Sequence, residues 1–202
     1  MKKTMILILA LCLALLSCPV WAETAQQSPI HGARYFFEHK MIPQLFYEDP
    51  ESVMNGMKDG GAFDLWKRFT EQNKIDLTYS AEDFSVREFP QEDGMEMVMI
   101  SLPKPPDSPL CSRIYLCYVP AARTGMVYTV EYDNMFGDTW FLCGWTKDGT
   151  HQNYGGAMPL SPEDSGYEEG LQQEAEQVRR LMLEDVPPVG SYNPDDGSVS
   201  VP

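Results

Sequence analysis

The sequence predicts an α+β domain in which short N-terminal helices pack on a curved antiparallel sheet of five to six strands, followed by a C-terminal helix. Three observations predict this class. Apolar residues recur at helical spacing in the first third of the chain, and alternating β-branched and aromatic runs follow from residue 84. Helical spacing returns after residue 161. The separators between the strand-like runs are too short for parallel crossovers, so neighbouring strands are expected to be antiparallel.

Composition narrows the class of protein further. The chain has 202 residues, of which 43% are hydrophobic and 11% aromatic, which is typical of a globular domain and too apolar for a disordered chain. Asp and Glu number 30 against 15 Lys and Arg, which gives a formal charge of −15. Because phosphate backbones and anionic lipid surfaces are bound largely through basic residues, this charge argues against nucleic acid or a membrane surface as the partner.

The N-terminus is predicted to be a targeting segment. Lys2 and Lys3 precede an uninterrupted apolar run over residues 5–16, and Ala22 supplies the small residue at a cleavage site. Twelve helical residues at ~1.5 Å each span about 18 Å, short of the ~30 Å hydrocarbon core of a bilayer. We therefore expect a signal peptide over residues 1–22, a linker over 23–27 and no membrane span in the mature chain. Removal of the signal peptide takes away two lysines and no acid, which changes the formal charge of the chain from −15 to −17.

Cys18 leaves a second type of processing open. The segment Leu15-Leu16-Ser17-Cys18 resembles a lipobox, in which the cysteine becomes acylated and anchors the protein to the membrane. Pro19 directly after that cysteine instead favours ordinary cleavage, because proline suits the region just before a cleavage site. Secretion into the periplasm, the envelope or the medium is the first expectation, and a membrane-anchored lipoprotein is the alternative.

The helices are predicted from their start signals and breaks. Ser28-Pro29 starts a first helix, and Pro43 must kink or restart it. Asp49-Pro50-Glu51 repeats the start signal for a short helix that ends at Gly60-Gly61, and Asn73 is the expected end of the next helix. The final helix is expected to open at Ser161-Pro162.

Six strands are predicted, and they belong to one domain over residues 28–186. The expected strands cover residues 84–89, 95–102, 110–119, 126–134, 139–147 and 150–154. Asp148-Gly149 is the strongest hairpin signal, and it makes the last of these runs a strand. Residues 187–202 are rich in Pro, Gly, Ser and Asp and are predicted to be a disordered tail.

The order of helices followed by an antiparallel meander over residues 28–155 resembles the cystatin-like and NTF2-like architecture. The resemblance implies a curved sheet that forms a cone with the helices. Such cones occur in binding modules and in enzymes, so the architecture does not decide between them. The C-terminal helix departs from that pattern.

Pairing the strands predicts a candidate ligand site. If the hairpins close at Val119/Met126 and Asn134/Thr139, one face of the sheet is aromatic. The candidate ligand-binding residues on that face are Arg113, Tyr115, Tyr128, Tyr132 and Trp145. The face is either a core beneath the N-terminal helices or the lining of a pocket. Arg113, its one charged member, either reaches the sheet edge along its apolar stem or binds an acidic ligand group.

No metal site, cofactor or catalytic residue is predicted. Cleavage at Ala22 leaves Cys111, Cys117 and Cys143, an odd number that we expect to be buried free thiols. His31 and His39 stand about 12 Å apart along one helix, too far to chelate one ion. Cys143 and His151 are the one nucleophile–base pair close in sequence, but in the assumed register they face opposite sides of the sheet.

These observations predict an exported bacterial protein that acts as a binding or interaction module for an unidentified protein or small-molecule ligand. Two alternatives remain open. One is a small hydrolase or isomerase that uses a cone-shaped pocket with acids and His151. The other is a lipid-anchored envelope component.

Overall fold

The computed structural model describes residues 29–76, 79–103, 110–133 and 139–185. The predicted signal peptide and linker, Cys18 and the predicted tail lie outside these residues. The helical elements are α2 (Pro29–Phe36), η1 (Phe37–Met41), α3 (Ile42–Glu48), α4 (Pro50–Gly56), η2 (Met57–Gly61), α5 (Ala62–Asn73), the single turns η3 (Ala81–Asp83) and η4 (Pro120–Ala122), and α6 (Tyr167–Asp185). No helix in the described ranges is long and apolar enough to cross a membrane.

The sheet is a six-stranded antiparallel meander, which confirms the predicted α+β class. Its strands are β1 (Ser85–Glu92), β2 (Met95–Ser101), β3 (Leu110–Val119), β4 (Thr124–Asp133), β5 (Thr139–Trp145) and β6 (His151–Gly156), in that spatial order. Tight turns at Asp93-Gly94 and Asp148-Gly149 close two of the hairpins, and both glycines adopt the positive φ that favours glycine.

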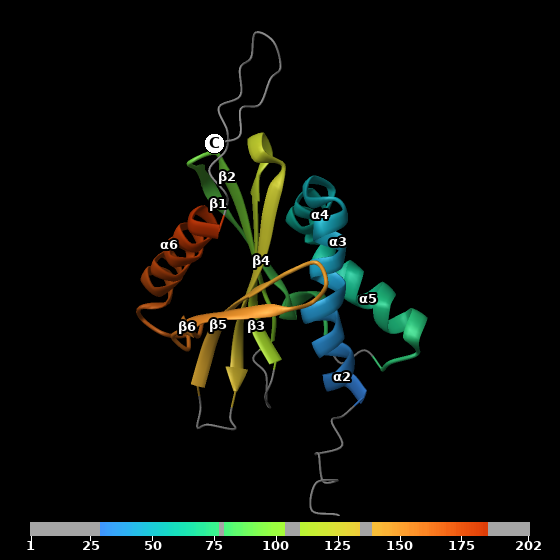
Figure 1. The fold of residues 1–202 in the computed structure, drawn as a ribbon. Helices are drawn as coiled ribbons and strands as arrows, with labels where there is room; N and C mark the ends of the chain where they lie inside the picture. Colours follow the sequence, from blue (N-terminus) through green and yellow to red (C-terminus); the bar gives the residue numbers. More distant parts are fainter. Residues whose placement is uncertain (1–28, 77–78, 104–109, 134–138, 186–202) are drawn as a thin grey trace, which may run out of the picture.

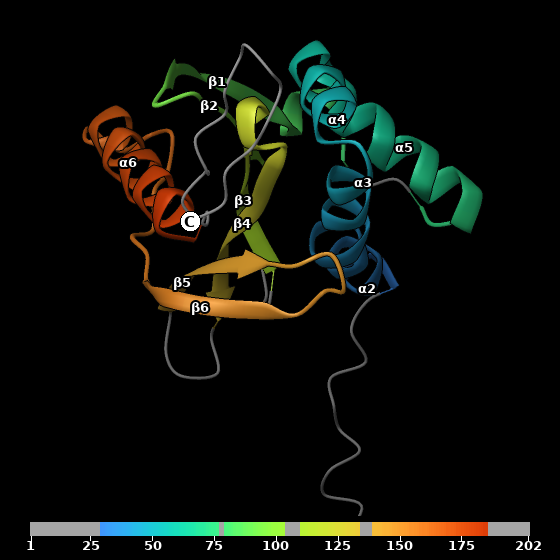
Figure 2. The ribbon, with the colours of Figure 1, turned by 45° about the horizontal axis from the view of Figure 1, so that its top comes forward.

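Helices cover both faces of the sheet. The N-terminal helices lie on one face and α6 lies on the other, so that the sheet is sandwiched between two helical layers (Figure 1). The same separation is visible when the molecule is turned (Figure 2). Each face has its own core, one built with Phe37, Trp66 and Trp145 and the other with Tyr115, Tyr128 and Leu171. The second covered face departs from the one-sided cone that the resemblance implied.

Pro43 does not end its helix, and Pro162 does not start one. At Pro43 the helix continues through η1, where the Ile42 N–H bonds five residues back to the Phe37 carbonyl. Pro43 lacks an N–H, so a wider helical turn at this point loses no regular bond. Pro162 does not open α6: the backbone of Ser161 accepts from Asp164 N at 2.9 Å in a separate turn, and the helix begins at Tyr167.

A buried ion pair docks the N-terminal helices on the sheet. The pairing of β3 with β4 shifts between Cys111 and Arg113, which marks a bulge at Ser112. Arg34 donates to the Cys111 carbonyl at 2.5 Å, and Glu38 accepts from the Cys111 N–H at 3.0 Å. Arg34 and Glu38 also bond to each other. One turn of helix thus satisfies both backbone groups of Cys111.

A second buried ion pair docks α6 on the opposite face. Arg113 donates two hydrogen bonds to the Glu174 carboxylate, from Nε at 2.7 Å and from Nη2 at 2.9 Å. Tyr115 donates its hydroxyl to the same carboxylate at 2.6 Å. Arg113 is buried, and its partner is internal. Its guanidinium stays inside the fold against Glu174 and does not reach the sheet edge.

The predicted register of β5 is wrong by one residue. Asp133 pairs with Thr139, and so Tyr128 stands opposite Gly144 and Val127 opposite Trp145. Because side chains alternate along a strand, this shift moves Trp145 to the face away from Arg113, Tyr115 and Tyr128. The aromatic face of β3 and β4 is covered by α6 and not by the N-terminal helices.

Candidate functional site

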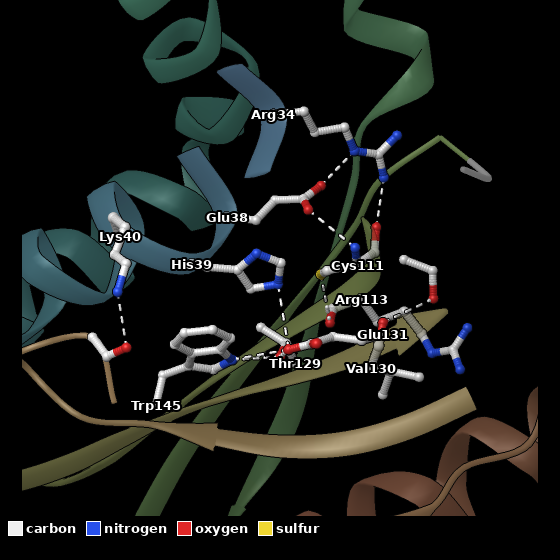
Figure 3. Close-up of polar contacts among 12 residues, drawn as sticks. Arg34, Glu38, His39, Lys40, Cys111, Arg113, Thr129, Val130, Glu131 and Trp145 are labelled. Carbon is white, nitrogen blue, oxygen red and sulfur yellow. Dashed lines mark hydrogen bonds and ion pairs between the residues drawn. The ribbon is translucent and has the colours of Figure 1, made fainter. Parts of the chain in front are cut away.

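Polar side chains gather around Trp145 on the face that the N-terminal helices cover. We call this set the Trp145 cluster; its members are Tyr35, His39, Thr129, Glu131, Trp145 and His151. His39 comes from η1, Thr129 and Glu131 from β4, and Trp145 from β5 (Figure 3). His151 opens β6 directly opposite Trp145 in the β5–β6 pairing. The cluster therefore joins the helical layer to the last hairpin of the sheet.

One oxygen of Glu131 receives most of the polar contacts. Thr129 Oγ1 donates to Glu131 Oε1 at 2.6 Å, and Trp145 Nε1 donates to Thr129 Oγ1 at 2.6 Å and to Glu131 Oε1 at 3.2 Å. His39 Nε2 lies 3.3 Å from the same oxygen (Figure 3). The Glu131 side chain keeps 15% of its surface exposed, whereas His39 has 0%. The carboxylate thus stands at the border between the core and solvent.

These contacts favour the ionised form of Glu131. Burial by itself would raise the pKa of the carboxyl, but the His39 imidazole and the Thr129 hydroxyl outweigh burial and lower that pKa below its usual range. His151 adds a smaller contribution in the same direction. The cluster is therefore built around a fixed negative charge, and it can hold a donor or a cation against it.

The lowered pKa of Glu131 predicts a pH-dependent stability. A carboxyl whose pKa is lower in the folded chain stabilises the fold above about pH 4.3, the usual value for Glu, and this contribution is lost as the pH falls through the folded pKa. We expect Glu131→Gln to be less stable than wild type at pH 7, with a gap that narrows in acid, measured by urea unfolding across pH. Exposed Glu82 is the control; a gap of the same size in Glu82→Gln would contradict the assignment.

Trp145 is enclosed by two histidine rings. The ring of His39 stacks on it at a centroid distance of 4.6 Å, and that of His151 at 4.9 Å. Tyr35 packs against His39 at 4.4 Å, and Lys40 Nζ lies 5.7 Å from the Trp145 ring. Lys40 also donates to the Gly149 carbonyl in the hairpin turn at 2.9 Å. Stacking and one lysine thus hold the β5–β6 hairpin against η1.

Cys143 lies on the same face as Trp145 and His151. This corrects the prediction that Cys143 and His151 face opposite sides. The reason is a separate one-residue difference in the β5–β6 pairing, in which Cys143 stands opposite Asn153 and Trp145 opposite His151. Burial, and then the neighbouring Glu131, raise the pKa of the Cys143 thiol to about 12. A thiol that stays protonated at neutral pH is a poor nucleophile, so this geometry does not favour thiol chemistry.

All three described cysteines are free and buried, as predicted. Burial also raises the pKa values of Cys111 and Cys117. With a pKa of about 12, Cys143 has a thiolate fraction roughly 1,000-fold or more below that of a free cysteine, whose pKa is ~8.5. We expect a thiol-reactive dye at pH 8 to leave Cys143 unlabelled until denaturant is added, as read by mass spectrometry. Labelling of Cys143 as fast as that of the exposed control Ser165→Cys would contradict this.

The predicted ligand-binding residues fall into two groups. Arg113 and Tyr115 share the Glu174 carboxylate, and Tyr128 stands opposite Tyr115 in the β3–β4 pairing. Tyr132 packs against Trp140 at 5.2 Å on that same face. Trp145 is separated from all of them by the sheet. Tyr115 and Tyr128 each have 0% exposed surface, so this face is core.

The sequence interpretation missed the Trp145 cluster. In the strand registers assumed from the sequence, Thr129, Glu131 and His151 fall on the face opposite Trp145, and His39 enters only as a possible metal ligand. The described residues contain no group of three or more His, Cys, Asp or Glu placed to hold a metal ion. A two-residue turn at Asp148-Gly149 would place His151 opposite Thr146, but Thr146 bonds to Thr150 across a three-residue loop, and His151 therefore pairs with Trp145.

A shallow hollow lies far from this cluster. It holds about 270 Å³ beside the β1–β2 hairpin and is lined by Lys58, Glu88, Phe89, Gln91, Glu96 and Met97. Lys58 lies 3.4 Å from Glu96 and 3.8 Å from Glu88, so its charge is already balanced. The hollow is smaller than the roughly 300–1,000 Å³ of small-molecule sites.

No family model, curated protein or solved structure matches this chain.

Proposed function

We propose that this chain is an exported bacterial binding or interaction module that presents its β5–β6 hairpin to a partner. The observation that carries the proposal is that packed side chains fill both faces of the sheet. Tyr115 and Tyr128, which a cone-shaped pocket would expose, have 0% exposed surface beneath α6. A partner is then met on the surface of the fold and not inside it.

The Trp145 cluster supports the choice of the hairpin. Lys40 and His39 from η1 hold the hairpin through the Gly149 carbonyl and the Trp145 ring. Such a tether keeps an exposed element in one conformation, and a pre-organised surface loses less entropy when it binds. The exported location rests on the residues before Glu23, and the formal charge of −17 after cleavage suits a soluble exported chain.

Site-specific photo-crosslinking tests the proposal in cells that export the protein. A photo-reactive residue is placed at exposed Gln72 on α5, Gln152 on β6 or Gln173 on α6. We expect an adduct of one defined mass from Gln152 and none from the two matched positions. Absence of any position-specific adduct from a normally exported protein would contradict a binding module.

The hydrolase or isomerase alternative predicts a different result. Within the Trp145 cluster, His151 and Tyr35 are exposed ionisable groups, and His151 is the one that could act as a base near neutral pH. Turnover of a small-molecule substrate that His151→Ala abolishes, with the fold intact by circular dichroism, would replace the binding proposal by an enzymatic one. The mass of the exported form separates the lipid-anchored alternative, because a start at Glu23 indicates free secretion and a diacylated Cys18 indicates an anchor.

A further inference from the structure

The two edges of the sheet differ in how they are protected. On β1, Pro90 falls within an irregularity between Phe89 and Glu92, and proline cannot donate to a further strand. Ion pairs tie the same strand to α6, Arg87 to Glu168 at 2.7 Å and Glu92 to Arg179 at 2.6 Å. Proline, charge and irregular pairing are the means by which proteins block edge-to-edge pairing. The β1 edge is therefore closed to a further strand.

The β6 edge lacks most of this protection. Its sequence is HQNYGG, with no proline and no Lys, Arg, Asp or Glu. His151, Gln152 and Asn153 are exposed, and pairing with β5 is regular over these three residues before it shifts at Tyr154. Figure 2 shows β6 at the rim of the sheet with no described element along its outer side.

The backbone of β6 directs two residues outward. Thr146 N donates to the Thr150 carbonyl at 2.9 Å, and Trp145 pairs with His151 in the same register. Bonded and non-bonded pairs alternate in an antiparallel ladder, so His151 and Asn153 turn their N–H and C=O groups away from β5 while Gln152 bonds to β5. Among the described residues, the backbone hydrogen bonds outside helices and strand ladders include none to the N–H or C=O groups of His151 or Asn153.

This edge is held in place before any partner arrives. The His151 ring stacks on Trp145 at 4.9 Å, and Lys40 holds the adjoining turn through Gly149. At the other end, Asn153 Oδ1 accepts from the Gly155 N–H at 2.7 Å. An extended segment that adds to this strand therefore meets a fixed row of donors and acceptors.

We propose that the outward backbone of His151–Asn153 is a docking edge for an extended, basic segment of a partner protein, which adds to the sheet as a further strand. Main-chain hydrogen bonds supply the affinity in this mode of recognition. The basic character follows from the charge of −15, or −17 after cleavage, which attracts cationic segments and repels a second copy of the chain. This inference rests on the proposed function and names its surface and its kind of partner.

Amide hydrogen exchange measured by NMR tests the docking edge. The probe is a short synthetic peptide of alternating Lys, Val and Thr with blocked ends, at millimolar concentration. We expect it to slow exchange at the His151 and Asn153 amides by about tenfold or more, and to change the Gln152 amide little because that amide already bonds to β5. The same peptide with every second nitrogen methylated cannot complete the ladder and should give no protection.

A substitution pair in the protein provides a second control. Asn153→Pro removes one outward N–H without removing a bond to β5, whereas Asn153→Ala keeps that N–H. Both lose the Asn153 side chain, so only the proline variant should bind the peptide about tenfold or more weakly. Equal binding by the two variants, or by the methylated peptide, would overturn the proposal.

The remaining outcomes separate this proposal from the proposed function. If the His151 amide exchanges more slowly as the protein concentration rises, without peptide, two copies of the chain pair through this edge. That result would overturn the proposal that the edge binds a basic segment of a partner protein. A defined adduct from Gln152, with no peptide protection on β6, would overturn the docking edge while the proposed function stands. No adduct at any position and no peptide binding would overturn both.

Discussion

Glu174→Ala is expected to lower the free energy of unfolding by about 3–5 kcal/mol, because it leaves Arg113 buried without its counter-charge. Arg113 and Glu174 have only 4% and 6% of their side-chain surfaces exposed. The same change removes the acceptor of the Tyr115 hydroxyl, which lies 2.6 Å from the carboxylate. Urea unfolding followed by circular dichroism measures the loss.

Two further variants separate the ion pair from a general effect on α6. Gln172→Ala changes an exposed residue of the same helix and should shift stability by no more than about 0.5 kcal/mol. Arg113→Met combined with Glu174→Leu removes both charges, so the double variant should be more stable than Glu174→Ala alone. A loss below about 1 kcal/mol in Glu174→Ala would mean that Arg113 does not depend on this partner.

Trp145→Ala is expected to cost about 3–5 kcal/mol, the usual range for truncating a packed tryptophan. Trp145 has 2% exposed surface, belongs to the core beneath the N-terminal helices and stacks with His39. The truncation also removes the donor to Thr129 Oγ1. Chemical denaturation measures the loss, and a value below about 1 kcal/mol with the fold intact would show that Trp145 is not a packed core residue.

Trp145→Phe separates packing from hydrogen bonding. Phenylalanine keeps an aromatic ring between the two histidines but lacks the Nε1 donor to Thr129 and Glu131. We expect it to cost less than the alanine variant, because most of the buried ring surface is retained. Equal losses in the two variants would assign the effect to the hydrogen bonds and not to the stack.

The local features of the fold could be predicted from the sequence because short-range rules govern them. The change from helical to alternating spacing predicts where helices give way to strands, and Asp148-Gly149 predicts the last hairpin. The α5 helix ends at Asn73, as its stop signal indicates. Three buried thiols likewise follow from cysteines placed in apolar strands.

The faces of β5 could not be predicted in this way. Its sequence, TWFLCGW, carries large apolar residues at both parities, with Trp140 and Leu142 on one face and Phe141 and Trp145 on the other. Such a pattern fits either register, and a shift of one residue exchanges the faces. Only packing against two helical layers decides which tryptophan meets which helix.

The partners of the buried charges also depend on tertiary structure. Arg113 and Glu174 are 61 residues apart, and Arg34 meets the Cys111 carbonyl across 77 residues. The sequence alone determined the α+β class, the order of its elements and the need of Arg113 for a partner, because spacing, turn residues and the cost of burying a charge act locally. The tertiary structure decided which face each helical layer covers and which acid each arginine meets, because those outcomes depend on contacts between residues far apart in the chain.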